Sequence, residues 1–496
     1  MKLEIAFGLS SVLWLSAMPL AAQETNQVEQ LKKQLQELKE NFQKVQEQQR
    51  QQIESLQKKL ETLQRQTVTN QPGAVASPPA APAGLSTATV TPWSPTAPIR
   101  IGSGQNYINL SFDALMAAGA TTANDIDKLE LGGHDPKQRG FTVQNLETVF
   151  DGKVDPYFRG QANVVLQIDS HGETTIEAEE AYLETLSLPW NLQVKAGQFF
   201  TEFGRLNPTH PHTWDFVDQP LVNGRFLGED GLRSAGARLS WLVPTPFYSE
   251  LFFTLANSQG ETAFSFRNDH EGEPFLGRPA IERGVKTLGD MLFVPRYAAS
   301  FDLTDAQTVV AGASAAFGPN SSGSDTDTQI YGVDLFWKWK SPRQHAGFPF
   351  VSWQTEALLR RFKAGAFNGD LNGDGILDPG EQDLNGDGVP DVLPGETLID
   401  YGVYSQIAYG IKKGWVAALR GDYVFPDKQG LYESIIGPDP DRASRYRISP
   451  NLTYYPSEFS KIRLQYNFDH RNGIGDDHSV WMQFEFLLGT HAAHKF

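Results

Sequence analysis

The most specific chemical motif in the sequence is an acidic, glycine-rich loop that begins at Asp370. Residues 370–381 have the sequence DLNGDGILDPGE, which has the spacing of a twelve-residue EF-hand calcium loop. In such a loop the first, third, fifth, ninth and twelfth side chains and the seventh carbonyl bind the ion, and glycine at the sixth position permits a sharp turn. The predicted calcium ligands are therefore Asp370, Asn372, Asp374, Ile376, Asp378 and Glu381.

A second, incomplete copy of this motif follows directly. It offers Asp383, Asn385, Asp387 and Asp391 at the matching positions, but Pro394 occupies the place of the final glutamate. Residues 368–396 contain eight acidic and no basic side chains, so a solvated acidic loop without an ion is the alternative. The complete spacing of the first copy favours a structural calcium ion.

Two histidines in the stretch 201–232 form a second candidate site. His210 and His212 are two positions apart, and Asp215 or Asp218 follows closely. Imidazole nitrogen and carboxylate oxygen are both ligands of zinc, so these residues could bind Zn²⁺. The motif is short, and it is far less specific than the calcium loop.

The same stretch holds charges of both signs between stiff proline and aromatic residues. Carboxylates and guanidinium groups that face each other across a pore create a transverse field that orients polar solutes. We expect this stretch to fold inward as the constriction of a channel; an outward loop against a neighbouring subunit is the alternative. The expected constriction residues are His210, His212, Asp215, Asp218, Arg225, Glu229, Asp230 and Arg233.

Several classes of function are disfavoured by composition. The sequence has no cysteine, which excludes a thiol nucleophile, disulfides and Cys-ligated metals. It has no Gly-x-Ser-x-Gly, phosphate-cradling or His-Glu-x-x-His motif, so we expect no enzyme activity. The net charge of −17 argues against nucleic acid as a partner, because binding to phosphates requires a concentrated basic surface.

The elements that must position these residues are β-strands. After Arg100, apolar and polar side chains alternate with a period of two, which is typical of strands with one apolar face. The clearest run has Met482, Phe484 and Phe486 alternating with polar Gln483. Sixteen runs are predicted, at 105–117, 141–154, 157–168, 177–186, 191–200, 233–243, 247–256, 294–304, 308–317, 328–338, 348–362, 400–411, 415–424, 445–455, 459–469 and 479–488.

The connections between these runs alternate between short and long. An antiparallel membrane barrel with short periplasmic turns and long external loops has this asymmetry, although 339–347 is long for a periplasmic turn. We therefore expect an all-β fold, a 16-stranded antiparallel transmembrane β-barrel whose lumen is too wide for side chains to fill. A water-soluble sandwich or propeller is the alternative, but it does not account for connections of such unequal length.

The segment before the barrel has three parts. Residues 1–22 have the layout of a secretory signal peptide, with an uncleaved anchor as the alternative. Residues 23–65 carry apolar side chains at 3-4 spacing with one stutter near Gln49, which predicts a periplasmic coiled coil instead of a lone amphipathic helix. Residues 66–99 are rich in Pro, Ala, Ser and Thr and form a linker to the barrel domain 100–496.

Short motifs on the predicted strands resemble the phosphate-selective porin O/P family. They are EAYLE at 180–184, VKAGQFFTEFG at 194–204, GLR at 231–233 and GAR at 236–238. The resemblance implies a trimeric, sixteen-stranded channel of the Gram-negative outer membrane, often with an N-terminal coiled coil. Anion selectivity in that family rests on a ladder of Arg and Lys along the pore, and the acidic composition of this chain predicts no such ladder.

Together these features predict an outer-membrane porin, a water-filled channel for passive diffusion of small hydrophilic solutes or ions. We expect a homotrimer in outer-membrane lipid, inserted by the barrel-assembly machinery with Phe496 as the C-terminal signal. One alternative is a regulated receptor for zinc uptake, although residues 23–99 do not resemble the plug domain of an energy-coupled receptor. The other is a structural tether, in which the barrel anchors the coiled coil that reaches toward the cell wall.

Overall fold

The computed structural model describes residues 98–103, 106–153, 155–168, 172–268 and 270–489. The predicted signal peptide, the coiled coil, most of the linker and Phe496 lie outside these residues. Among the described residues, no helix has the length and apolar character needed to cross a bilayer.

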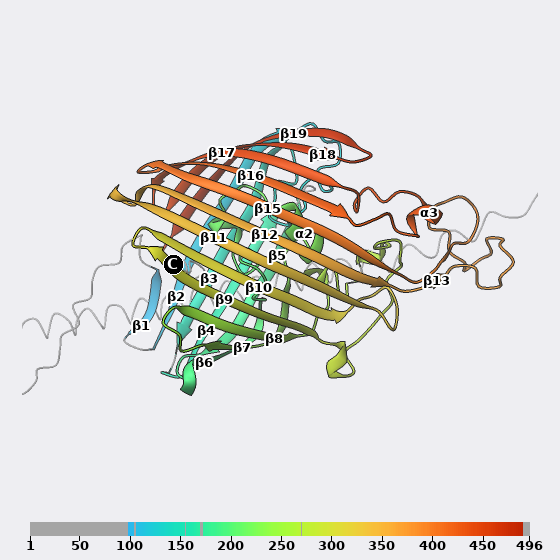
Figure 1. Cartoon of the computed structure of the whole chain (residues 1–496), viewed down its shortest axis with the longest axis horizontal. Helices are drawn as coiled ribbons and strands as arrows, with labels where there is room; N and C mark the ends of the chain where they lie inside the picture. Colours follow the sequence, from blue (N-terminus) through green and yellow to red (C-terminus); the bar gives the residue numbers. More distant parts are fainter. Residues whose placement is uncertain (1–97, 104–105, 154, 169–171, 269, 490–496) are drawn as a thin grey trace, which may run out of the picture. The chain divides into compact units, whose positions relative to one another are not determined.

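The described chain forms one large antiparallel barrel (Figure 1). Sixteen strands close it, each paired with the next along the sequence, and the last strand pairs with the first through contacts such as Trp481 with Gly119. The strands are β2 Asn106–Thr121, β3 Gly140–Lys153, β4 Phe158–Ile168, β5 Thr174–Thr185, β6 Leu192–Phe200, β7 Arg233–Leu242, β8 Tyr248–Ala256, β9 Leu292–Thr304, β10 Gln307–Pro319, β11 Asp327–His345, β12 Phe348–Ala364, β15 Glu396–Lys412, β16 Trp415–Pro426, β17 Arg445–Ser457, β18 Ser460–Arg471 and β19 Gly475–Leu488. The predicted all-β fold with sixteen barrel strands is confirmed.

Smaller elements accompany the sixteen strands that close the barrel. Strand β1, Ile99–Ser103, forms a hairpin with the start of β2 and was not predicted, because five residues are too few to show an alternation. The other elements are the pair β13 Phe367–Asn368 and β14 Val392–Leu393, the helices α2 Leu221–Leu227 and α3 Glu433–Ile436, and the 3-10 turns η1 Pro189–Asn191, η2 Pro211–Thr213, η3 Glu261–Ala263, η4 His270–Gly272 and η5 Leu288–Asp290.

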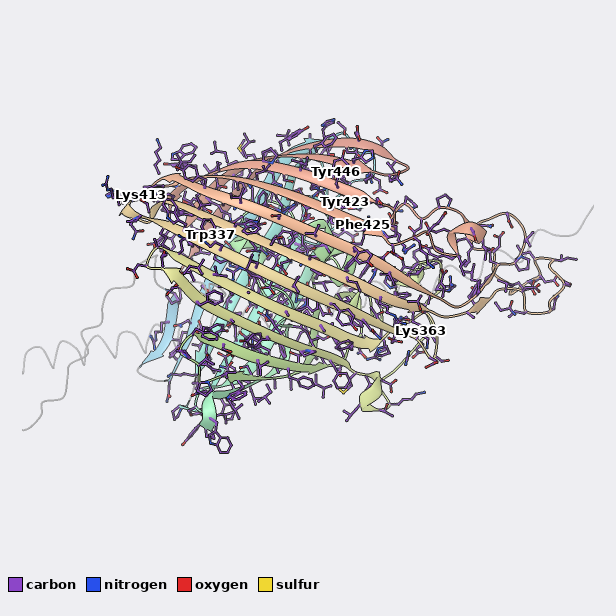
Figure 2. The ribbon with its side chains drawn as sticks, in the orientation of Figure 1. Trp337, Lys363, Lys413, Tyr423, Phe425 and Tyr446 are labelled. Carbon is purple, nitrogen blue, oxygen red and sulfur yellow. The ribbon has the colours of Figure 1, made fainter. Side chains whose placement is uncertain are left out.

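The barrel is apolar outside and polar inside. On β18 the outward side chains Ile462 and Leu464 are exposed, whereas Arg463 and Gln465 between them are almost fully buried. Figure 2 shows Trp337 nearer the end with the short turns, and Tyr423, Phe425 and Tyr446 further toward the other end. An apolar band between aromatic residues is the outer surface that a barrel presents to lipid.

The two ends of the barrel differ in their connections. At one end β9–β10, β15–β16 and β17–β18 are joined by two residues each, whereas the other end carries the long loops 122–139, 201–232, 257–291, 365–395 and 427–444. The connection 339–347 is not long in the structure, because β11 continues to His345 and turns at Ala346 and Gly347. Both turn residues have positive φ, at 52° and 84°, as a tight hairpin of type I′ requires.

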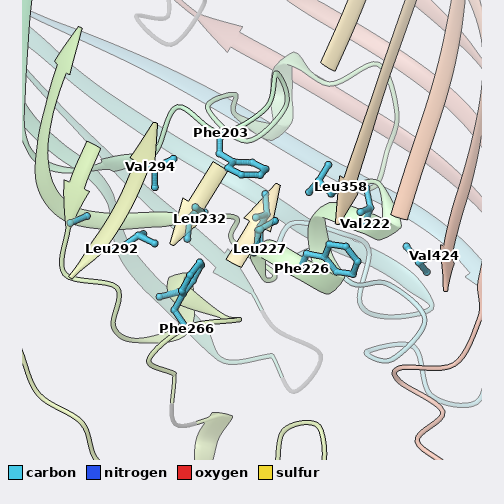
Figure 3. Packing of buried hydrophobic residues seen from close by; sticks show 14 of the residues in the cluster. Phe203, Val222, Phe226, Leu227, Leu232, Phe266, Leu292, Val294, Leu358 and Val424 are labelled. Carbon is cyan, nitrogen blue, oxygen red and sulfur yellow. The ribbon is translucent and has the colours of Figure 1, made fainter. Parts of the chain in front are cut away.

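Part of the lumen holds a packed apolar cluster. Helix α2 contributes Val222, Phe226 and Leu227, which pack near Leu358 of β12 and Val424 of β16 (Figure 3). Gly402 of β15 makes room for the helix, since a Cβ there would lie 2.2 Å from Cγ2 of Val222. The cluster shows that loop 201–232 lies inside the barrel, where it can position the residues of a site.

Candidate functional site

Loop 201–232 leaves the wall after β6, crosses the lumen and returns to β7. Its backbone N–H groups donate to inward-pointing side chains of distant strands: Leu206 to Glu356 of β12, Val217 to Gln465 of β18 and Leu221 to Asp422 of β16. Pro220 fixes an extended turn directly before α2. Because these strands lie across the barrel from β6 and β7, where the loop begins and ends, the loop spans the lumen instead of folding outward.

The first attachment of the loop is at Glu356. Its two carboxylate oxygens accept hydrogen bonds from the N–H groups of Arg205 and Leu206, at 3.0 and 2.9 Å. Gly204 precedes them with a φ of +62°, and a Cβ at this position would lie 2.1 Å from Oε2 of Glu356. Glycine is therefore required both for the backbone conformation and for the close approach of the loop to the wall.

The second attachment is the fully buried carboxylate of Asp218. It forms ion pairs with Arg420 of β16, at 3.0 Å, and with Arg447 of β17, and it accepts hydrogen bonds from Gln465 and Asn467 of β18. Burial by itself would raise the pKa of Asp218, but the two guanidinium groups hold that pKa below its usual range. One loop carboxylate thus binds the loop to three neighbouring strands.

A row of arginines lines this sector of the wall. Arg447 also pairs with Glu130 of loop 122–139 at 2.7 Å and with Asp469 at 2.8 Å. The buried arginines of β16, β17 and β18 are Arg420, Arg445, Arg447, Arg463 and Arg471. The sequence did not predict this row, but most of its arginines have a carboxylate partner.

The third attachment is at the two histidines of the loop, whose rings stack with centroids 5.8 Å apart. Nδ1 of His210 lies 2.8 Å from Oε2 of Glu179 and 3.3 Å from Oε1 of Glu147. Nδ1 of His212 lies 3.3 Å from the other oxygen of Glu147. Burial lowers the pKa of His210, but the charges of Glu147 and Glu179 outweigh that effect and raise it well above its usual value.

A β-bulge brings the acidic residues of β5 to this site. Between β4 and β5 the register skips Glu179, so that both Glu179 and its neighbour Glu180 are buried in the lumen. Oε2 of Glu180 lies 3.1 Å from Nε2 of His210. Neither residue was predicted as part of the site, because two adjacent acids within a run of period two are the only signal that the sequence offers.

The other predicted constriction residues lie apart from the histidines. Asp215 accepts a hydrogen bond from Gln406 at 3.3 Å, and Arg225 donates to backbone carbonyls of loop 427–444. Glu229 pairs with Lys137 at 3.6 Å and Arg233 pairs with Glu177. Burial raises the pKa of the Asp230 carboxyl. The predicted zinc partners Asp215 and Asp218 thus have other contacts, and Glu147 and Glu179 take their place beside the histidines.

Two of the cavities that residues of the loop line lie on opposite sides of it. A cavity of about 570 Å³ lies toward the short turns, where Arg205, Trp214 and Asp215 of the loop line it. A cavity of about 420 Å³ lies toward the long loops and is lined by Arg225 and Glu229 together with residues of loops 257–291 and 427–444. A solute that passes through the barrel has to pass loop 201–232.

The two copies of the calcium motif wind in the same way. In the first copy, Asp370 accepts hydrogen bonds from the N–H groups of Gly373 and Gly375, at 2.7 and 3.1 Å. In the second, Asp383 accepts them from Gly386 and Gly388, at 2.6 and 2.8 Å. The remaining predicted ligands, Asn372, Asp374, Ile376, Asp378, Glu381, Asn385, Asp387 and Asp391, lie on the same two turns, between β13 and β14.

Comparison with known proteins identifies one clear relative. The chain is 30% identical over 387 residues to an uncharacterized protein of Aquifex aeolicus, and the match covers 74% of this chain and 73% of the relative. No family model matches the chain, so the resemblance to phosphate-selective porins stays a prediction.

Several solved structures have a similar fold. They include the outer-membrane channel DcaP of Acinetobacter baumannii, with 14% identity, a TM-score of 0.49 and coverage of 79% of this chain and 100% of that chain. An anion-selective porin from Comamonas acidovorans has 8% identity, a TM-score of 0.45 and coverage of 77% and 100%. OmpF of Salmonella typhi has 11% identity, a TM-score of 0.43 and coverage of 78% and 100%. At TM-scores below 0.5 these likenesses carry no argument about the function of this chain.

Proposed function

The chain belongs to the same family as the uncharacterized Aquifex aeolicus protein, and we propose that it is an outer-membrane porin, a water-filled channel for passive diffusion of small hydrophilic solutes or ions. The observation that supports this proposal most strongly is the loop 201–232, which crosses a sixteen-stranded lumen with a cavity on each side of it. The exposed apolar side chains of the outer wall, such as Leu464 and Phe484, suit insertion in lipid.

The charges around the loop suggest how the channel discriminates among solutes. Arginines gather on β16, β17 and β18, where Asp422 and Asp469 pair with them, and Glu147, Glu179 and Glu180 stand on β3 and β5. Charges of both signs along a pore wall create a local field, which favours polar solutes that can align with it.

Conductance of the purified protein in a planar lipid bilayer tests the proposal. Each insertion should add a step of ohmic current, and the reversal potential under a salt gradient gives the ion preference. Bilayers that take up folded protein without any current would refute a channel. Cross-linking in detergent at graded protein concentration tests the proposed homotrimer.

We propose that the acidic loop binds calcium as a structural ion. The support is the winding of the two copies, in which Asp370 and Asp383 each accept two glycine N–H groups. Calcium outside the cell is abundant enough to fill a site of low affinity. The ion would hold residues 370–391 as a compact unit between β13 and β14.

Regulated uptake of zinc is a second candidate function, and the histidine cluster of the loop favours it. Uptake of ⁶⁵Zn²⁺ and of a neutral sugar into proteoliposomes distinguishes the two candidates. A porin admits both, whereas a zinc receptor admits zinc alone. The third candidate, a tether to the cell wall, depends on residues 23–65, and deletion of 24–65 should then weaken the envelope without changing conductance.

A further inference from the structure

Three elements bring nitrogen and oxygen donors together inside the lumen, beyond anything the porin function requires. His210 comes from loop 201–232, Glu147 from β3 and Glu179 from the bulge of β5. One donor atom from each of the three residues lies within 4.8 Å of the other two. The convergence is tertiary, because these residues are separated by 30 or more positions in the sequence.

The spacing of the donor atoms is close to that of a metal site. A zinc ion binds imidazole nitrogen and carboxylate oxygen at about 2.0–2.2 Å, which places the ligand atoms roughly 3.3–3.6 Å apart in a tetrahedron. The observed separations from Nδ1 of His210 are 2.8 Å to Glu179 and 3.3 Å to Glu147. A bound ion therefore requires only that Glu179 moves away from His210 by roughly half an ångström.

The donor atoms of the cluster are buried and face one another. Oε2 of Glu179 lies 2.8 Å from Nδ1 of His210, and Oε1 lies 3.4 Å from Nε2 of His134. Nitrogen and oxygen donors that converge in this way are arranged as ligands of a common ion are.

Carboxylates outnumber imidazoles in this cluster. Asp113, Glu147, Glu179 and Glu180 are four buried carboxylates that surround three imidazoles, those of His134, His210 and His212. Burial lowers the pKa of His134 and of His210, but the carboxylates outweigh burial and raise it, so a metal ion would take the place of protons that these imidazoles otherwise hold.

From these observations we propose that Glu147, Glu179 and His210 bind a divalent transition-metal ion in the lumen. Imidazole nitrogen selects such ions over Ca²⁺ and Mg²⁺, which prefer oxygen ligands, so this site is chemically distinct from the acidic loop 370–396. His134 lies 3.4 Å from the second oxygen of Glu179, and Asn163 donates to Glu147 at 2.6 Å. Both neighbours orient the ligand carboxylates, as partners outside the coordination shell commonly do.

Occupancy of this site would fix the loop to the wall. The metal would join His210 of the loop to Glu147 of β3 and Glu179 of β5. Coordination bonds would then strengthen the third attachment of the loop. The site thus goes beyond the porin function, since an open channel does not need it.

Zinc binding by the full-length, untagged protein tests the proposal. Protein is equilibrated with micromolar free Zn²⁺ in the presence of millimolar Ca²⁺, which occupies the acidic loop, and bound zinc is measured by mass spectrometry. We expect about one zinc per chain for the native protein and less than a tenth of that for His210→Ala and Glu179→Gln. The control His470→Ala changes an exposed histidine that pairs with Asp476, and it should retain the zinc.

A second measurement does not depend on the folding of a variant. X-ray absorption at the zinc edge of the loaded native protein should show nitrogen and oxygen ligands at about 2.0–2.2 Å with the scattering pattern of imidazole. Native protein without bound zinc, or with zinc in a shell that lacks imidazole, would overturn the proposal. Conductance in zinc-free buffer is measured separately, so failure of the metal site and failure of the channel are distinguishable.

Discussion

Replacement of Asp218 by Asn probes the coupling between the loop and the channel. The side chain keeps its shape and can still accept a hydrogen bond, but it loses the charge that pairs with Arg420 and Arg447. Arg420 keeps its partner Asp422, and Arg447 keeps its two partners Asp469 and Glu130. The change therefore weakens the attachment of loop 201–232 while the barrel wall stays paired.

The magnitude follows from the burial of Asp218, which is 1% exposed. Removal of one partner from a buried ion pair typically costs about 3–5 kcal/mol. Since a factor of ten corresponds to about 1.4 kcal/mol, the population of the detached loop should rise roughly a hundredfold to a few thousandfold. A detached loop no longer separates the two cavities, so single-channel conductance should increase.

The selectivity of the channel should change as well. Asp218→Asn leaves an excess of one positive charge beside the arginine row, so the reversal potential under a KCl gradient should shift toward anion preference. Asp325→Asn is the matched control, because it removes the same charge from a fully exposed carboxylate that pairs with Lys363. If both variants keep the conductance and the reversal potential of the native protein, Asp218 does not position the loop in the way described.

Three further predictions concern the wall, the acidic loop and helix α2. Leu464→Arg places a charge in the middle of the lipid-facing band and should lower the free energy of unfolding in lipid by about 2–4 kcal/mol. The control Leu431→Arg changes a residue on an exposed loop and should alter that free energy by less than about 0.5 kcal/mol. Millimolar calcium should protect residues 370–391 of the native protein from protease, and the double variant Asp370→Ala with Glu381→Ala should lose this protection. The control Asp441→Ala should keep it, and equal protection of both variants would contradict a calcium loop. Gly402→Ala should destabilise the packing of α2 by about 1–3 kcal/mol and increase the noise of the open channel, because its Cβ would overlap Val222. Gly421→Ala, where a Cβ meets nothing within 4 Å, is the control, and equal noise in the two variants would contradict this packing.

The number and position of the barrel strands could be predicted from the sequence because each strand shows its own alternation of apolar and polar side chains. Side chains on opposite faces of a strand meet lipid and lumen, so residues such as Phe484 and Gln483 alternate whatever the neighbouring strand contains. The end of β11 before the turn at Ala346 and Gly347 was harder to predict. The side chains from Pro342 to His345 are exposed on both faces of the strand, so the alternation of buried and exposed residues ends before the strand does.

The bulge at Glu179 shows where this local evidence stops. Period two assigns Glu179 and Glu180 to opposite faces of β5, yet the skipped register turns both into the lumen. A similar limit applies to the arginine row. Net charge sums over the whole chain, so it hides the gathering of arginines on β16, β17 and β18.

The sequence by itself determined the strand count, the inward or outward direction of most side chains and the pair of calcium-type turns, since each depends on residues close together in the chain. Tertiary structure alone decided which charges meet. Asp218 meets arginines more than 200 positions away, and His210 meets Glu147 and Glu179 instead of its sequence neighbour Asp215. The physical reason is closure of the barrel, which sets the strands around one lumen and lets a single loop reach several of them at once.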